Sequence, residues 1–259
     1  MEQLTIVKIG GNVTDDPNEL QDFLQRFAAL PGHKILVHGG GKTTTTLCKR
    51  LNLPQTMIEG RRITTPETLD VAIMVYAGLV NKKIVSALQN AGCDAIGLSG
   101  ADAAVIKSIR RSRTPIDYGW VGDIEPSSVN TTRLSQLLGL GLTPVLCAIT
   151  QSGDGLLNTN ADTVASMLAI ALCRQYDVRL IYCFEKKGVL SDPANDESVI
   201  ESLTQAMVTD LRAKGAIQGG MIPKLDAAFR SLNSGVTQVR ICHAHHISEG
   251  IGTTLKYGG

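Results

Sequence analysis

The feature that most constrains the fold is a series of short apolar runs separated by amphipathic stretches. These runs are continuous rather than alternating in polarity, and they lie at residues 4–9, 34–38, 95–98, 144–149, 178–184 and 236–242. A strand with one solvated face alternates apolar and polar residues, whereas a strand buried on both faces does not. The pattern therefore predicts a largely parallel sheet between two layers of helices, an α/β fold.

The stretches between the runs carry apolar residues at helical spacing. The expected helices are residues 18–30, 43–51, 67–78, 81–91, 132–139, 162–175, 204–214 and 221–233. Residues 55–64 and the polar stretch 105–122 read as hairpins, residues 151–158 as turns, and residues 253–257 as a last strand. No linker rich in Pro, Gly or Ser divides the chain, so we expect one two-lobed unit over residues 1–259.

Composition excludes several classes of function. The 259 residues include 25 Lys and Arg against 24 Asp and Glu, a net charge of +1. That balance gives no electrostatic reason to bind nucleic acid or an anionic membrane. No uninterrupted apolar run approaches the roughly 18 residues of a bilayer span, and the first residues lack the basic start of a secretory signal. The six cysteines form no CxxC pair, which favours reduced thiols and a cytoplasmic location.

Glycine clusters follow the first two apolar runs and precede expected helices. They are Gly10-Gly11 and residues 39–41. Ligands of parallel sheets bind beyond the carboxyl ends of the strands, and a glycine turn before a helix offers free N–H groups to an anion. We expect a phosphate there, although tight turns alone would also need glycine. The segment is not a Walker P-loop, because that motif needs glycine where Leu36 stands.

Charged residues occupy other positions that favour a ligand site. Lys8 lies near the end of an apolar strand, and Lys224 lies in the first turn of an expected helix. Either lysine could instead reach solvent. Asp162 could hold a lysine in its charged form, while Asn160 or Asp162 could simply cap the helix. Arg62 is suited to a substrate carboxylate, or it is a solvated surface charge.

Five short motifs occur in one order along the chain. They are KIGG, HGGG, GRRIT, NTNAD and GGMIPK. Together they resemble the amino acid kinase family, in its acylglutamate kinase branch, over essentially the whole chain. The resemblance implies a three-layer αβα sandwich around a mainly parallel sheet of about eight strands. It also implies an N-terminal lobe, about 1–175, for the amino acid and a C-terminal lobe, about 176–259, for ATP.

The implied reaction transfers the γ-phosphoryl group of ATP, with Mg²⁺, to the side-chain carboxylate of N-acetyl-L-glutamate in arginine biosynthesis. By the resemblance, Lys8 and Lys224 are catalytic cations and Asp162 organises them. No protein residue is expected to be a metal ligand, because the phosphates hold the Mg²⁺. The phosphate-binding N–H groups belong to four glycines, which are Gly10, Gly11, Gly40 and Gly41. A γ-carboxylate is ionised at neutral pH, so the reaction needs no general base.

The resemblance assigns further residues to the two substrates. Arg62, Asn158 and Asn160 correspond to positions that bind the amino acid. Glu185 and Gly188 lie where the family has its nucleotide-side loop. The family usually carries aspartate where Glu185 stands, so the contact made there depends on the longer side chain.

Other readings remain open at this stage. The HGGG motif runs into Lys42 and four threonines, and these residues or Arg61 could contact a larger acyl group such as N-succinyl. A sister kinase of the family and a non-catalytic nucleotide-binding regulator are further alternatives. His243 and His245 lie two residues apart and could bind a metal, although a surface loop is the simpler reading.

The resemblance also implies a homodimer. Arginine-inhibited relatives carry an extra N-terminal helix that links dimers into hexamers, and only seven residues precede Lys8 here. We therefore expect a homodimer that arginine does not inhibit. The expected partners are small molecules, ATP and an N-acylglutamate.

Overall fold

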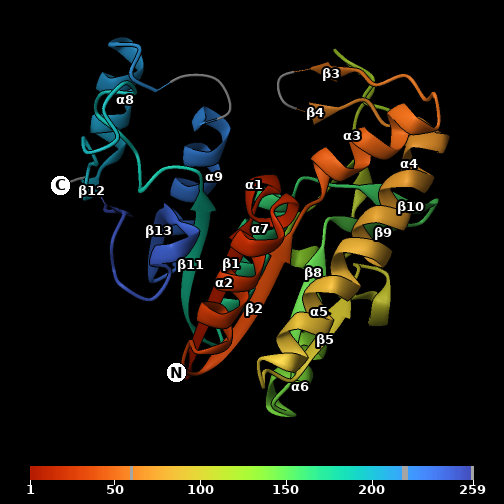
Figure 1. The fold of residues 1–259 in the computed structure, drawn as a ribbon, viewed down its shortest axis with the longest axis horizontal. Coiled ribbons are helices and arrows are strands. Elements are labelled where there is room, and N and C mark those ends of the chain that lie inside the picture. The colour runs from red at the N-terminus through yellow and green to blue at the C-terminus, as the bar shows by residue number, and fades with distance from the viewer. Residues whose placement is uncertain (59–60, 218–220, 258–259) are drawn as a thin grey trace.

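A mainly parallel, eight-stranded sheet forms the middle layer of the protein (Figure 1). The computed structural model describes residues 1–58, 61–217 and 221–257. Strand order across the sheet is β12-β14-β13-β11-β1-β2-β8-β5, and β14 runs antiparallel to β13. The strands are β1 (Gln3–Ile9), β2 (His33–His38), β5 (Ala95–Leu98), β8 (Thr143–Cys147), β11 (Asp177–Phe184), β12 (Ser202–Leu203), β13 (Gln238–His243) and β14 (Thr253–Leu255). The predicted fold class is confirmed.

Helices cover both faces of this sheet. They are α1 (Gly11–Asp15), α2 (Pro17–Ala28), α3 (Gly41–Arg50), α4 (Pro66–Ile73), α5 (Asn81–Asn90), α6 (Thr131–Gly139), α7 (Ala161–Leu172), α8 (Gln205–Ala213) and α9 (Met221–Asn233). Neighbouring residues of β1 enter different cores: Ile6 packs with α6, α7 and α9, and Val7 packs with α2, α4 and α5. Burial on both faces is why the strand sequences are continuously apolar.

Smaller elements surround the sheet. Three are hairpins, β3–β4 (Met57–Ile58 and Arg61–Arg62), β6–β7 (Ile109–Arg110 and Gly122–Asp123) and β9–β10 (Ile149–Ser152 and Gly155–Asn158). Three are 3₁₀ turns, at Asp102–Ala104, Pro126–Ser128 and Ala244–His246. The hairpins expected at 55–64 and 105–122 are present in the described residues, and residues 59–60 lie outside them.

Some sequence expectations were wrong in detail. The apolar run 144–149 is not one strand, because β8 ends at Cys147 and Ile149 begins the β9–β10 hairpin. The Thr159 N–H donates to the Ala148 carbonyl, which closes that hairpin against the end of β8. Of the residues expected to be rich in turns, 151–158, only 153–154 form a turn, and the rest belong to β9 and β10. An apolar run shows burial but not a change of direction, so the pattern could not reveal this corner.

Residues 81–91, which could either continue or restart the helix expected at 67–78, continue it as one helix. A π-helical segment, Met74–Val80, joins α4 to α5, and the combined helix Pro66–Asn90 spans 25 residues. Its length and composition would suffice to cross a membrane, although no uninterrupted apolar run indicated this. However, 44% of its most apolar stretch is buried in the protein, and Val71, Ile84 and Leu88 pack into the core. A core helix of the sandwich satisfies the same length and composition test.

Candidate active site

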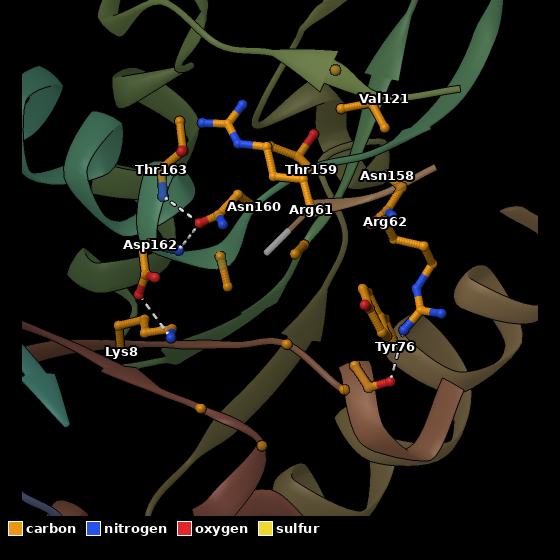
Figure 2. Close-up of a pocket in the computed structure, with 18 of the residues that line it drawn as sticks. Lys8, Arg61, Arg62, Tyr76, Val121, Asn158, Thr159, Asn160, Asp162 and Thr163 are labelled. Carbon is orange, nitrogen blue, oxygen red and sulfur yellow. Dashed lines mark hydrogen bonds and ion pairs between the residues drawn. The ribbon is translucent and has the colours of Figure 1, made fainter. Parts of the chain in front are cut away.

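A cavity of about 230 Å³ opens at the carboxyl ends of β1 and β2 (Figure 2). The glycines after these strands line one side, and residues 158–163, where β10 leads into α7, line another. The β3–β4 hairpin contributes Met57, Arg61 and Arg62. The cavity therefore lies where parallel sheets place their ligands.

Lys8 and Lys224 both contact Asp162. The Lys8 Nζ lies 2.7 Å from Asp162 Oδ1, and the Lys224 Nζ lies 2.6 Å from Asp162 Oδ2. The three residues come from β1, α9 and the first turn of α7, so residues 216 positions apart in sequence share one carboxylate. The Lys8 side chain is 9% exposed and that of Lys224 is 24% exposed. Neither lysine is a freely solvated surface charge.

Burial and charge act against each other in this cluster. Burial favours the neutral form of Asp162, but the charges of Lys8 and Lys224 outweigh it and lower the pKa of Asp162 to about 2. Burial also lowers the pKa of the Lys8 ammonium, and the Asp162 charge opposes that shift. Asp162 thus holds two cations together where water is scarce.

The glycine clusters lie beside these charges. Gly10, Gly11 and residues 39–41 all line the cavity, and α3 begins directly after Gly40. Glycine is required at position 40, because a Cβ there would lie 2.8 Å from the Tyr76 ring. The four glycines predicted to bind phosphate are thus all at the cavity. Gly219 and Gly220 of the GGMIPK motif lie outside the described residues.

His38 lies beneath the second glycine turn and is fully buried. Its Nδ1 lies 2.8 Å from the Gly39 carbonyl oxygen, and its Nε2 lies 3.0 Å from Asn81 Nδ2. Asn81 Nδ2 can only donate, so Nε2 accepts and the proton is on Nδ1, which donates to Gly39. Burial lowers the pKa of His38 to about 4, and the ring stays neutral at physiological pH.

This pKa predicts a loss of stability in acid. An unfolded histidine has a pKa near 6.5, so between pH 6.5 and pH 4 the unfolded state binds a proton that the folded state does not. The free energy of unfolding should fall by about 3 kcal/mol from pH 7 to pH 4 on account of His38. Urea denaturation across this range, with His38→Gln and the same-strand control His33→Gln, measures the contribution. Equal slopes for wild type and His38→Gln would contradict it.

Arg62 is buried at the opposite end of the cavity. Figure 2 shows it extending toward Tyr76 and α3. Its guanidinium donates to Gln55 Oε1, to the Gly41 carbonyl at 3.0 Å and to Thr45 Oγ1 at 2.8 Å. These bonds use three of its five N–H donors and leave two for a ligand. Arg62 is therefore fixed in position rather than a solvated surface charge.

The two predicted asparagines have different surroundings. Asn158 is buried, and its Nδ2 donates to Thr64 Oγ1 at 3.1 Å. Asn160 is exposed at the cavity rim and caps α7, since its Oδ1 accepts from Asp162 N at 2.8 Å and Thr163 N at 3.2 Å. The capping reading of Asn160 is confirmed, and both residues line the cavity.

Several cavity residues were missed at the sequence level. Tyr76 projects from the π-helical segment, and Arg111 and Asp123 pair with each other across the β6–β7 hairpin. The hairpin itself was expected from the sequence, but not its place at the cavity, where Gly122 is required because a Cβ there would lie 2.9 Å from both Ser108 Oγ and Thr159 Oγ1. The stretch 105–122, which had no assigned role, thus forms part of the cavity wall.

A second cavity, of about 320 Å³, lies at the carboxyl end of β11. Its lining is mainly apolar and consists of Phe184, Lys186, Gly188, Val189, Leu190, Pro193, Gly215, Ala216, Ile217 and Met221. Gly188 is buried at its wall, where a Cβ would lie 2.6 Å from Thr253 Oγ1. Glu185 is exposed and lines neither this cavity nor the first.

His245 and His246 pair with carboxylates, and His243 Nδ1 accepts from the His245 N–H at 3.3 Å. His245 Nε2 lies 2.8 Å from Glu19 Oε2, and His246 Nδ1 lies 2.7 Å from Glu249 Oε2. Within residues 1–58, 61–217 and 221–257, no group of three or more His, Cys, Asp or Glu side chains is arranged to hold a metal ion.

Comparison with known proteins shows which family has this fold and site. The profile of the amino acid kinase family matches residues 3–243. The chain belongs to the amino acid kinase family. Acetylglutamate kinase of Phocaeicola vulgatus is 49% identical over 256 residues, covering 98% of this chain and 99% of the relative. Acetylglutamate kinase of Bacteroides thetaiotaomicron is 48% identical over 256 residues, with 98% and 99% covered.

A solved structure of the same fold is smu.665 from Streptococcus mutans. It has 26% sequence identity and a TM-score of 0.79, with 98% of each chain covered. Like other members of the amino acid kinase family, this chain is a kinase, an enzyme that transfers a phosphoryl group.

Proposed function

We propose that this amino acid kinase phosphorylates the side-chain carboxylate of N-acetyl-L-glutamate with ATP, a step of arginine biosynthesis. The observation that carries the proposal is the convergence of Lys8 and Lys224 on Asp162 beside two glycine turns. The proposed substrate is taken from the names of the relatives, acetylglutamate kinases that are 48–49% identical over nearly the full chain.

The chemistry requires an anion to approach a triphosphate. The γ-carboxylate of the substrate is already ionised at pH 7, so it can attack without a general base. The main barrier is charge repulsion, which catalysis would reduce by positioning and by electrostatic stabilisation of the transferring group. Lys8 and Lys224 would neutralise that group, and the N–H groups of Gly10, Gly11, Gly40 and Gly41 would donate to its oxygens. Asp162 would keep both lysines charged and in place.

The second cavity would hold the nucleotide base, because it offers an apolar slot next to the lysine cluster. Phe184 connects the two sites, since the Lys224 Nζ lies 5.9 Å from its ring centroid. Gly188 lines the slot, and Glu185, which is exposed, would contact ATP only from outside it. We assign ATP to a C-terminal lobe of about residues 176–259 and the amino acid to residues 1–175.

The charged groups fit a Mg²⁺ ion that arrives on ATP. Asp162 already directs one oxygen at each lysine, so it is not free to become a metal ligand. We assign no protein ligand to the metal. When bound, Mg²⁺ would be held by phosphate oxygens and would neutralise their charge.

Arg62 would bind the α-carboxylate of the amino acid with its two remaining N–H donors. Arg62→Ala should raise the KM for the amino acid by about 10- to 100-fold, the cost of a lost hydrogen bond to a charged group. The KM for ATP should stay within about twofold. Steady-state kinetics with each substrate varied in turn test this split, and Arg62→Lys shows whether charge without the planar fork suffices. Equal increases in both KM values would contradict the assignment.

One observation favours a second substrate, N-succinyl-L-glutamate. Arg61 lines the cavity in addition to Arg62, and N-acetylglutamate has no third carboxylate for it, whereas Arg111 in the same lining is paired with Asp123. Lys42, which the sequence suggested as a contact for a larger acyl group, is exposed and does not line the cavity. We keep N-acetylglutamate as the first candidate because of the relatives' names.

ADP release tests the proposal. Purified protein with MgATP should release ADP at a rate that depends on an N-acylglutamate and not on free glutamate. Comparison of the N-acetyl and N-succinyl substrates identifies the preferred acyl group. ADP release that no N-acylglutamate stimulates would refute the proposal, and would favour a sister kinase or a non-catalytic nucleotide binder.

A further inference from the structure

The π-helical segment Met74–Val80 lies directly against the second glycine turn. In a π-helix the backbone bonds run from residue i to residue i+5. One of these bonds joins the Asn81 N–H to the Tyr76 carbonyl. In a regular α-helix, residues five apart differ by about 140° around the axis. The wider π turn brings residues five apart closer to one face, so that the side chains of Tyr76 and Asn81 can both contact one neighbouring segment.

Tyr76 contacts the turn at Gly40. Its ring is buried at the cavity wall, and the space that a Cβ of Gly40 would occupy lies 2.8 Å from Tyr76 Cδ1 and 3.0 Å from Cε1. The ring therefore limits how far the Gly40 backbone can move toward it. Gly40 is also the N-cap of α3, since the Thr44 N–H donates to the Gly40 carbonyl at 2.9 Å.

Asn81 contacts the turn through His38. Its amide is almost fully buried and has fixed partners: Nδ2 donates to His38 Nε2 at 3.0 Å and to the Val145 carbonyl at 2.9 Å. This donation needs the lone pair of His38 Nε2, so it favours the same tautomer as the Gly39 carbonyl, which accepts from Nδ1–H at 2.8 Å. The hydrogen bond from His38 to the Gly39 carbonyl oxygen thereby fixes the orientation of the peptide plane between Gly39 and Gly40.

The orientation of this peptide plane sets the direction of the Gly40 N–H. In a trans peptide the C=O and N–H groups point in opposite directions, so fixing the Gly39 carbonyl on His38 turns the Gly40 N–H away from His38. Among the backbone hydrogen bonds of the described residues, none uses this N–H as donor. It remains available to a ligand of the cavity.

We propose that the π turn is a positioning element for the phosphate-binding glycines, with Tyr76 and Asn81 as positioning residues that act through Gly40 and His38. Neither residue needs to touch the reacting atoms. The inference rests on the proposed function in one respect, namely that the Gly40 N–H donates to the transferring phosphoryl group. Its structural part, the His38 tautomer that Asn81 favours, stands independently of any activity.

The test combines spectroscopy with kinetics. Protein with ¹⁵N-labelled histidine is examined by NMR as wild type, Asn81→Ala and the control Asn90→Ala, an exposed asparagine at the end of the same helix. His38→Gln identifies the His38 signals. We expect wild-type and Asn90→Ala His38 to carry its proton on Nδ1 and to stay neutral down to about pH 5. In Asn81→Ala the Nε2 loses its donor and only the Gly39 carbonyl still favours the Nδ1–H form, so the Nε2–H tautomer should be more populated than in wild type.

The kinetic arm measures kcat and KM of the same proteins. Asn81→Ala should lower kcat by about 10²-fold, as expected for a small misplacement of a catalytic donor, while both KM values change by less than about threefold. Tyr76→Leu should lower kcat similarly, and Tyr76→Phe, which keeps the ring, should rescue it. Wild-type His38 protonated on Nε2, or an Asn81→Ala kcat equal to that of Asn90→Ala, would overturn the inference. If wild type has no kinase activity, the proposed function fails, and the tautomer result still decides the structural part.

Discussion

Lys8→Ala is expected to lower kcat by about 10²- to 10³-fold, with smaller changes in both KM values. Lys8 is buried at the carboxyl end of β1, and its ammonium lies 2.7 Å from Asp162. It would act where charge develops on the transferring phosphoryl group, and removal of one such preorganised donor typically costs this much. Single-turnover and steady-state kinetics with MgATP and an N-acylglutamate measure the effect.

Two further variants make the test of Lys8 specific. Lys8→Met keeps most of the buried volume without the charge, so it should lose as much kcat as Lys8→Ala while folding normally. Lys83→Ala removes an exposed lysine of α5 and should have no effect. Combining Lys8→Ala with Lys224→Ala should cost less than the product of the single losses, because the two lysines act on one group. A Lys8→Ala enzyme with near-full kcat would refute the assigned role.

Asp162→Asn is expected to change the pH dependence of catalysis as well as its rate. The Asp162 charge opposes the effects of burial and of Lys224, both of which lower the pKa of Lys8. Without that charge the pKa of Lys8 falls further, so the neutral lysine forms at lower pH than in wild type. We expect kcat to fall by about 10²-fold, as for loss of a preorganised charge, and the loss to be smaller at the acidic end of the pH profile, where Lys8 keeps its proton.

The free energy of unfolding should also fall in Asp162→Asn. Removing one partner of a buried ionic cluster leaves uncompensated charge, which typically costs about 3–5 kcal/mol. Urea denaturation of Asp162→Asn, with the exposed Asp154→Asn as control, measures this loss. A kcat–pH profile that runs parallel to that of wild type would contradict the proposed role of Asp162.

The sheet could be predicted from local sequence because its strands are buried on both faces. Ile6 and Val7 pack in different cores, and such a strand is apolar throughout. The corner at Ala148 was not predictable, because the apolar run continues through it. Likewise, nothing in the sequence from Met74 to Val80 separates a π-helix from an α-helix, since the two differ by one residue per bond and not in composition.

The candidate site was predictable to a similar extent. The glycine turns, Lys8 and Asp162 follow strands or begin helices, and chain order suggests that they meet at one edge of the sheet. Lys224 was a candidate from its place in the first turn of an expected helix, but only the family resemblance linked it to Asp162, which lies 62 residues earlier in the chain. Tyr76 and Arg111 enter the cavity from segments that pack there through tertiary contacts. No short motif marks such residues.

Trapping of the product with hydroxylamine tests the central claim most directly. Hydroxylamine converts an acyl phosphate into a stable hydroxamate, so it reports a phosphorylated carboxyl group and not ATP hydrolysis. With MgATP, wild-type protein should form the hydroxamate from N-acetylglutamate or N-succinylglutamate, Lys8→Ala should form about 10²- to 10³-fold less per unit time, and free glutamate should give none. Absence of hydroxamate with both N-acylglutamates would contradict the account of Lys8, Asp162 and Lys224 as a carboxylate kinase site.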